Sequence, residues 1–182
     1  ETAGRDVRRS YSYNTGEGPR NDLVGVFPQK DGKYFVGLNV LVGRMGAADI
    51  KQLAELADTH ASGEVRLSQR QNIILTDVPE SELDALLNAE LLTHYSPTPS
   101  PFMRGSVACT GTEFCSLSIV ETKNRQVRFA RWLKANVTIP DGLEEFHIHL
   151  SGCTASCAQP QIADVSLRGM KTRKNGEPVE AL

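Results

Sequence analysis

The chain has 182 residues, of which 40% are hydrophobic and 23% are charged. Its formal net charge of -2 offers no overall positive field for nucleic acid, and no apolar run approaches the ~18 residues that a membrane span needs. The length suits one domain or two small ones.

A polar segment that contains glycine and proline opens the chain. Residues 1–22 lack the apolar core of a secretion signal and are typical of a linker or an exposed arm. We therefore expect a cytoplasmic protein in a reducing compartment. The chain begins with Glu and stops just after a turn motif at 174–178, so we also expect it to be part of a longer protein.

Strands and helices then alternate along the chain. β-branched and aromatic residues predict a strand over 34–42, and an apolar stripe predicts a helix over 47–60. Two short strands are predicted over 64–68 and 72–76, after which Pro79 is expected to open a second helix. This order is typical of an α+β sandwich, in which helices cover one face of an antiparallel sheet.

A proline-rich segment at 96–101 predicts a stiff connection and a domain boundary. We therefore expect an α+β half-domain over 23–96 and a second, α/β domain over 97–182. The elements predicted for the second domain are a helical stretch that begins at Cys115, a helix over 125–135, and strands over 146–150 and 162–167.

The four cysteines form two pairs, Cys109 with Cys115 and Cys153 with Cys157. Each pair lies in a glycine-containing segment, so four thiolates from two loops could form one tetrahedral set. Such a set suits an iron–sulfur cluster or a zinc ion. In a reducing compartment, a metal site is favoured over two disulfides.

Spacing alone leaves the choice between cluster and zinc open. The second cysteine pair has the spacing of a zinc knuckle, whereas the first pair does not. His147 and His149 could in principle serve as zinc ligands, although a polar strand face is the favoured interpretation. The helical stretch expected at Cys115 would place that thiolate at a helix N-terminus, where negative charge is favoured.

Several motifs occur in a fixed order along the chain. They include Cys-Thr-Gly-Thr-Glu-Phe-Cys at 109–115, Glu-Thr-Lys at 121–123 and Ser-Gly-Cys-Thr-Ala-Ser-Cys at 151–157. With these motifs, and with further similar segments at 26–30, 34–44 and 66–72, the chain resembles the ferredoxin-dependent nitrite reductases. These enzymes belong to the sirohaem nitrite and sulfite reductase superfamily.

The resemblance implies that the four cysteines hold a four-iron–four-sulfur (4Fe-4S) cluster. It also implies that Cys157 bridges this cluster to the iron of a sirohaem group. The family uses the two centres to reduce nitrite to ammonium in nitrate assimilation, with six electrons from reduced ferredoxin. Sulfite reduction within the same superfamily and a non-catalytic zinc-stabilised module are the alternatives.

The resemblance further places Arg66, Gln71 and Asn72 at the edge of the sirohaem pocket, where cationic and amide groups suit its carboxylates. It implies a ferredoxin-like half-domain over 23–96, followed by a sirohaem- and cluster-binding α/β domain over 97–182 that is incomplete at its C-terminus. Only the second half of these pseudo-duplicated enzymes is matched. The Arg and Lys residues that clamp nitrite are therefore expected outside this chain.

Overall fold

The computed structural model describes residues 22–182, so the arm expected over 1–22 lies outside the described residues except for Asp22. Asp22 is buried, and its Oδ1 accepts a hydrogen bond of 3.1 Å from the backbone N–H of Val24. Among the described residues, no helix is long and apolar enough to cross a membrane.

The chain separates into two compact units. The first unit takes in the chain up to Val40 together with Arg44–Thr98, and the second takes in Leu41–Gly43 together with Pro99–Leu182. The domain boundary expected between residues 96 and 97 stays a prediction.

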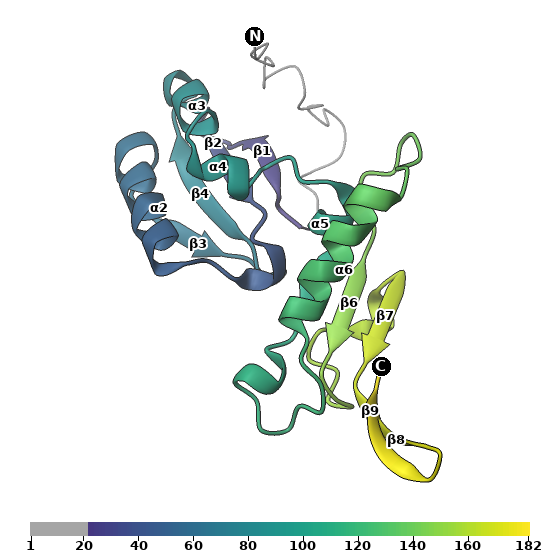
Figure 1. The fold of residues 1–182 in the computed structure, drawn as a ribbon. Helices are drawn as coiled ribbons and strands as arrows, with labels where there is room; N and C mark the ends of the chain where they lie inside the picture. Colours follow the sequence, from purple (N-terminus) through teal and green to yellow (C-terminus); the bar gives the residue numbers. More distant parts are fainter. Residues whose placement is uncertain (1–21) are drawn as a thin grey trace. The chain divides into compact units, whose positions relative to one another are not determined.

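The first unit is a four-stranded antiparallel sheet with helices on one face (Figure 1). The strand order is β1–β2–β4–β3, and Val36 lies opposite both Val26 and Leu75. The strands are β1 (Gly25–Pro28), β2 (Tyr34–Leu38), β3 (Val65–Leu67) and β4 (Ile73–Val78). The helices are α2 (Ala47–His60), α3 (Glu80–Leu87) and α4 (Leu91–His94).

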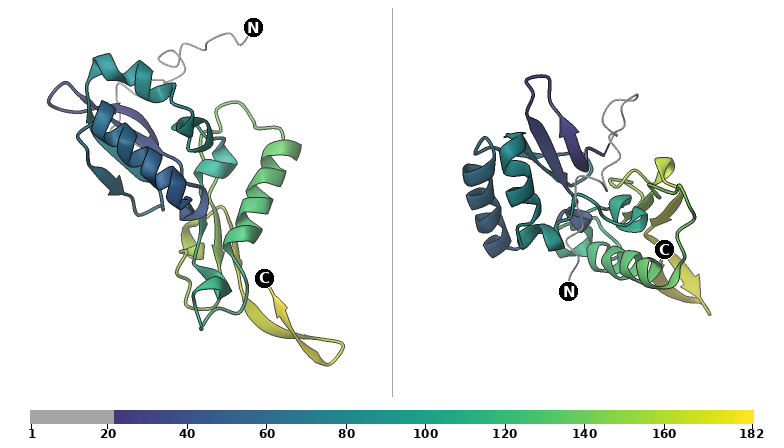
Figure 2. Two further views of the ribbon diagram at one scale, coloured as in Figure 1. Left: turned by 60° about the vertical axis from the view of Figure 1, so that its left-hand side comes forward. Right: turned by 90° about the horizontal axis from the view of Figure 1, so that it is seen from above.

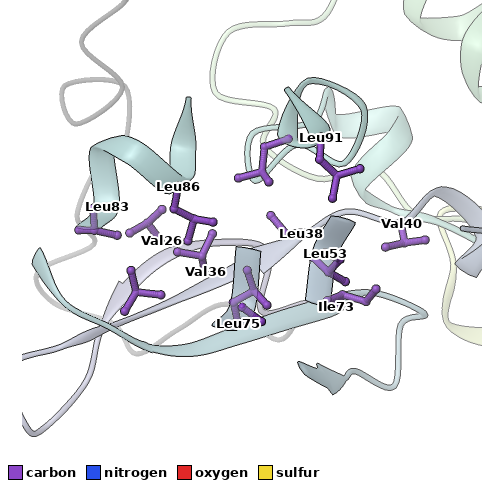
Figure 3. Packing of buried hydrophobic residues seen from close by; sticks show 13 residues of the cluster. Val26, Val36, Leu38, Val40, Leu53, Ile73, Leu75, Leu83, Leu86 and Leu91 are labelled. Atoms are coloured by element: carbon purple, nitrogen blue, oxygen red, sulfur yellow. The ribbon is translucent and has the colours of Figure 1, made fainter. Parts of the chain in front are cut away.

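An apolar core lies between this sheet and its helices (Figure 3). Leu38 and Leu75 from the sheet are fully buried, as is Leu86 from α3. Leu53 and Ala57 lie four residues apart on α2, so they share the face that packs on the core. The apolar residues from which the helix is predicted are therefore the ones that it buries in the core.

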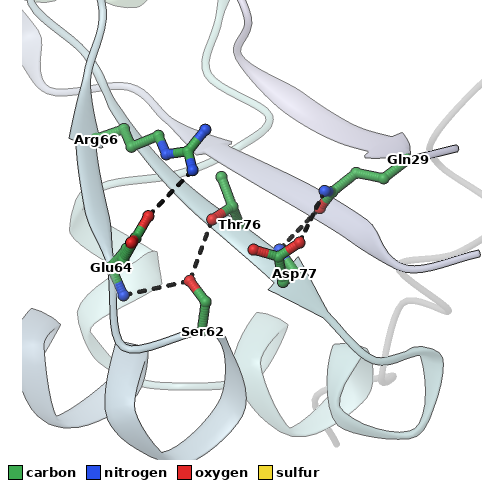
Figure 4. A network of polar contacts seen from close by, with 6 residues as sticks. All are labelled: Gln29, Ser62, Glu64, Arg66, Thr76 and Asp77. Atoms are coloured by element: carbon green, nitrogen blue, oxygen red, sulfur yellow. Dashed lines mark hydrogen bonds and ion pairs between the residues drawn. The ribbon is translucent and has the colours of Figure 1, made fainter. Parts of the chain in front are cut away.

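Polar side chains connect the strands of the same sheet (Figure 4). Gln29 and Asp77 bond reciprocally: Gln29 Nε2 donates to Asp77 Oδ1 at 3.0 Å, and the Asp77 N–H donates to Gln29 Oε1 at 2.8 Å. The bond from Gln29 is the main cause that lowers the pKa of Asp77, followed by a bond from Thr76. These contacts fix the end of β4, where Asp77 has a left-handed φ of 60°.

The second unit is built on a three-stranded parallel sheet in the order β5–β6–β7. A two-stranded hairpin, β8–β9, follows the end of β7 (Figure 2). The strands are β5 (Ser106–Ala108), β6 (Ile148–Ser151), β7 (Val165–Arg168), β8 (Met170–Lys174) and β9 (Glu177–Ala181). The helices are α5 (Pro101–Arg104) and α6 (Lys123–Asn136), with single 3₁₀ turns at Leu41–Gly43, Gly111–Glu113 and Pro160–Ile162.

A segment from much earlier in the chain completes this second unit. Val42 is fully buried against Ala108 of β5 and Leu150 of β6. The side-chain Nζ of Lys123, at the start of α6, donates to the carbonyl oxygen of Val42. The strand predicted over 34–42 is shorter than expected, since β2 ends at Leu38 and Leu41–Gly43 form a 3₁₀ turn that belongs to the second unit.

Most of the predicted elements are confirmed. The helix predicted over 47–60 is α2, and the helix predicted over 125–135 is α6 with a slightly earlier start. The helical stretch predicted at Cys115 is wrong, since residues 114–122, all within the described part of the chain, contain no helix. The backbone N–H groups of Ile119 and Val120 bond instead to the carbonyl oxygen of Gly152, at 2.8 and 3.2 Å.

Candidate functional site

Both cysteine loops leave the same edge of the parallel sheet. Ala108 at the end of β5 lies opposite Leu150 of β6. Cys109 follows β5 directly, and Cys153 follows the end of β6 by two residues. Because the carboxyl ends of parallel strands meet at one edge, the sheet brings the starts of the two loops together. The N–H of Cys109 also donates to the Leu150 carbonyl at 3.1 Å.

Gly152 joins the two loops by hydrogen bonds. Its N–H donates to Cys109 Sγ at 3.1 Å, and bonds of this kind stabilise negative charge on a sulfur ligand. A methyl group at this position would lie 1.9 Å from Ser118 Oγ, so glycine permits the close approach. The first cysteine loop is therefore folded against residues of the second.

Thr122 holds the backbone of the first cysteine. It is buried, and its hydroxyl donates to the Cys109 carbonyl at 2.6 Å. The sulfur of Cys109 lies 3.9 Å from the same hydroxyl oxygen. Sequence reasoning missed this support, although Thr122 belongs to the Glu-Thr-Lys motif that carried the resemblance.

The four thiols differ in exposure. Cys109, Cys115 and Cys153 are half-buried, Cys157 is exposed, and none of these four described cysteines is in a disulfide. The described residues contain no group of three or more His, Cys, Asp and Glu side chains arranged to hold a metal ion. The structure thus brings the two loops together without gathering their thiols into one coordination set.

The chemistry of the donors nevertheless fits a group held by thiolates. Four thiols lie on two loops that contact one another, and one sulfur already accepts a backbone N–H. Thiolate ligands with N–H···S bonds are the usual environment of an iron–sulfur cluster. The same donors also suit zinc, so the ligand set of Cys109, Cys115, Cys153 and Cys157 stays a prediction.

His149 lies on a buried strand face, not on a solvated one. Only 3% of its surface is exposed, because β6 runs between two other strands and is buried along its whole length. Its Nδ1 is 2.9 Å from the Gln159 carbonyl oxygen, which can only accept, so Nδ1 carries the proton of this bond. The ring of His147 contacts that of His149 edge to face, with centroids 6.0 Å apart.

Arg66, Gln71 and Asn72 lie in the first unit, around the turn that joins β3 to β4. Arg66 is exposed and pairs with Glu64 at 3.0 Å (Figure 4). Gln71 is half-buried in the turn, with a left-handed φ of 64°. Their expected contact with sirohaem stays a prediction.

The side chain of Asn72 supports the fold of the first unit. It is buried, and its Oδ1 accepts hydrogen bonds from Asn39 Nδ2 at 3.2 Å and from the Val40 N–H at 3.0 Å. Its Nδ2 is buried and has no hydrogen-bond partner among the described residues. The amide oxygen of Asn72 thus stabilises the fold, whereas its amide nitrogen has no acceptor among the described residues.

Comparison with known sequences identifies the relatives of this chain. The family model described as the nitrite/sulfite reductase ferredoxin-like half domain matches residues 27–91. The chain is 52% identical to the assimilatory ferredoxin-dependent nitrite reductase of Haloferax mediterranei, over 100% of this chain and 32% of that protein. It is 47% identical to the ferredoxin–nitrite reductase of Synechococcus elongatus, over 90% of this chain and 31% of that protein.

Solved structures agree with the sequence comparison. The NirA protein of Mycobacterium tuberculosis matches with a TM-score of 0.74 and 29% identity, over 86% of this chain and 29% of that chain. Dissimilatory sulfite reductase I matches with a TM-score of 0.61 and 16% identity, over 78% of this chain and 34% of that chain, which shows a shared fold. These matches confirm the expected α+β fold class with a ferredoxin-like half-domain.

The chain spans about a third of the length of the curated relatives it matches. Its family relationship rests on the half-domain model and on similarity along the whole chain. Residues 27–91 therefore match the nitrite/sulfite reductase ferredoxin-like half domain, and the chain as a whole is similar to a segment of the ferredoxin-dependent nitrite reductases.

Proposed function

We propose that this chain is the cluster-carrying part of an enzyme that reduces nitrite to ammonium with electrons from reduced ferredoxin. The observation that carries the proposal is the bond from the Gly152 N–H to Cys109 Sγ, which joins the two cysteine loops at one sheet edge. It occurs in a chain that is 52% identical to a protein named as an assimilatory ferredoxin-dependent nitrite reductase.

In this proposal Cys109, Cys115, Cys153 and Cys157 hold a 4Fe-4S cluster, and Cys157 also contacts the iron of sirohaem. Once bound, the two centres would supply electron storage and a metal that binds nitrite. The overall reaction consumes six electrons and eight protons for each nitrite and releases ammonium with two waters. The chain's own contribution is to hold four thiolates in place and to donate hydrogen bonds to their sulfur atoms.

The exposure of the cysteines supports different roles for them. Three thiols are half-buried, as suits ligands that face only a cluster, whereas Cys157 is exposed. A thiolate shared between two metal centres needs open space on both sides of its sulfur. Cys157 is therefore the best of the four for the bridging role.

The residues of the β3–β4 turn are proposed to meet the carboxylates of sirohaem. Arg66 offers an exposed guanidinium, and Asn72 offers a buried amide donor that lacks a partner among the described residues. A charged guanidinium forms strong hydrogen bonds to carboxylates, and a neutral amide N–H adds a weaker donor. Gln71 lies between them in the turn and completes the proposed set.

Anaerobic reconstitution of the full-length protein with iron and sulfide tests the ligand set. We expect iron and acid-labile sulfide in equal amounts, with a spin-resonance signal after reduction that is lost in Cys109→Ser and in Cys153→Ser. Ser118→Ala, which changes the same loop without removing a thiol, is the matched control and should keep the signal. Zinc bound without iron or sulfide would contradict the proposal and favour a zinc-stabilised module.

Sulfite is the second candidate substrate, because the matching family model covers nitrite and sulfite reductases alike. The relatives that share most of this chain are named for nitrite, so we expect nitrite to be preferred. Comparing kcat/KM for the two anions in the full-length enzyme decides between them. A higher value for sulfite would overturn the choice of nitrite and leave the proposed cluster site standing.

A further inference from the structure

Two side chains of β6 hold the backbone that follows Cys157. His149 and Ser151 are two residues apart on the strand, so both lie on the same face. Ser151 Oγ accepts a hydrogen bond of 3.1 Å from the Ala158 N–H. His149 Nδ1 donates to the Gln159 carbonyl at 2.9 Å. Consecutive residues of the loop are thus tied to alternate residues of one strand.

The turn held in this way is conformationally demanding. Cys157 lies inside a turn closed by the Gln159 N–H and the Ser156 carbonyl, at 2.8 Å. Ser156 and Gln159 both have left-handed backbone angles, with φ of 61° and 51°. Such a backbone conformation is unfavourable for residues other than glycine and persists only where the surroundings hold it. The two contacts from β6 supply part of that restraint.

The anchoring strand is a firm support for the turn. β6 is the middle strand of its sheet and pairs on both sides, with β5 and with β7. Ser151 and Ala158 are 1% and 2% exposed, so the bond between them is shielded from water, whereas the bond from His149, which is itself 3% exposed, to the exposed Gln159 is partly buried. Cys157, one residue before Ala158, is exposed. The two contacts therefore hold the backbone directly after an exposed thiol.

We propose that His149 and Ser151 are positioning residues that orient the Cys157 thiol for its role as a shared ligand. The inference rests on the proposed function, in which Cys157 contacts two metal centres. Neither side chain touches a metal in this scheme; each acts through the backbone of residues 158 and 159. Groups that orient metal ligands in this way typically contribute 10–100-fold to metal affinity.

Amide hydrogen exchange in the metal-free, full-length protein tests the contact itself. In Ser151→Ala the Ala158 N–H loses its acceptor, so exchange over residues 153–160 should become about tenfold faster. His149→Phe should have the same effect through Gln159. Thr76→Ala is the control, because it removes a similarly buried hydroxyl from β4 of the first unit, where Thr76 Oγ1 lies 3.1 Å from Ser62 Oγ. Exchange that is unchanged in Ser151→Ala and in His149→Phe overturns the inference.

Iron retention after reconstitution tests the consequence for the site. We expect Ser151→Ala and His149→Phe to assemble the cluster and to lose iron to a chelator about tenfold faster than the unsubstituted protein. Ser151→Thr keeps the hydroxyl and His149→Gln keeps an N–H donor, so both should restore much of the retention. Thr76→Ala should retain iron normally.

The two measurements separate this inference from the proposed function. If the unsubstituted protein takes up no cluster, the proposed function fails, and the exchange measurement still decides whether β6 holds the Cys157 turn. If it takes up a cluster that both variants hold equally well, the positioning role is overturned and the proposed ligand set is untouched.

Discussion

The two units of the molecule bury apolar and polar side chains in different proportions. In the first unit, apolar residues from one sheet and its helices form a large continuous cluster (Figure 3). In the second, a smaller cluster is formed by Val42, Ala108 and Leu150, and other buried apolar residues such as Phe102 and Ile148 lie outside it. Burial of apolar area stabilises the first unit with little demand on geometry, whereas the second unit depends more on specific partners.

Buried polar groups add to the apolar packing of the second unit. Gln126 of α6 is fully buried, and its Nε2 donates to Ser106 Oγ at 2.8 Å and to the Ile148 carbonyl at 3.1 Å. Thr122, His149 and Ser151 are also buried, and each bonds to backbone within or beside a cysteine loop. Because hydrogen bonds are directional, these contacts fix the positions of the cysteine loops in addition to stabilising the unit.

Leu38→Ala should produce the largest loss of stability, because it opens a cavity in the apolar cluster. We expect the free energy of opening of β2 and β4, measured by amide hydrogen exchange, to fall by about 3 kcal/mol. Leu67→Ala is the matched control in the same sheet, since Leu67 is 81% exposed, and it should change that free energy by less than about 0.5 kcal/mol. Equal effects would show that the first unit does not depend on its core.

Gly169→Ala should disturb the second unit through backbone contact. The added methyl group would lie 2.3 Å from the Gly152 carbonyl oxygen and 2.7 Å from Val120 Cγ2. We expect the free energy of unfolding of the second unit to fall by about 2 kcal/mol. Iron uptake should also fall, because Gly152 belongs to the second cysteine loop. Gly46→Ala, whose methyl group has no neighbour closer than 3.3 Å, should cost less than about 1 kcal/mol. Normal iron uptake in Gly169→Ala would contradict the coupling between this contact and the site.

Asn72→Ala separates a folding role from a binding role. It removes the acceptor of the buried Val40 N–H, so we expect the free energy of opening of β4 to fall by about 1.5 kcal/mol. Arg66→Ala should change it by less than about 0.5 kcal/mol, because the Arg66–Glu64 pair is exposed. Weaker sirohaem binding by Asn72→Ala with no loss of stability would show that the amide serves the cofactor alone.

Tyr95 should give the smallest effect, at alkaline pH. Burial, and then the hydrogen bond of 2.6 Å that its hydroxyl donates to Asp49, raise the pKa of Tyr95 to about 12. The stability due to neutral Tyr95 is therefore fully present below its ordinary pKa of 10.0 and is lost as the pH rises toward 12. Because the Tyr95 side chain is partly solvated, we expect the free energy of unfolding to fall by less than about 1 kcal/mol over this pH range.

Stability measured against pH in Tyr95→Phe checks this expectation. The variant should lack the alkaline loss that the unsubstituted protein shows between pH 10 and 12. Identical profiles would mean that Tyr95 titrates in the folded state as it does in the unfolded chain.

Elements with local signals were predictable from the sequence. The apolar stripe on α2 and the glycine that follows it, Gly63, define that helix within a short window. The error at Cys115 has a physical cause, because Ile119 and Val120 bond to Gly152, which lies more than a helix length away in sequence. No local pattern reports such a contact.

The candidate site was predictable in composition and only partly in arrangement. Cysteine spacing indicates two loops, but the parallel pairing of β5 with β6 is what brings them to one edge. Alternation along β6 puts His149 and Ser151 on one face without showing that this face is buried beneath the Cys157 turn. Long-range packing thus decides the roles of residues whose types are visible in the sequence.

The membership of Leu41–Gly43 in the second unit has a consequence for synthesis and for truncation. Val42 leaves the ribosome long before Ala108 and Leu150, so its buried place cannot form until the nascent chain extends beyond β6. A shortened protein that starts at Pro99 would lack this valine and the carbonyl that Lys123 bonds. The second unit is therefore discontinuous in the amino-acid sequence, and truncation at a single peptide bond cannot separate it intact from the first.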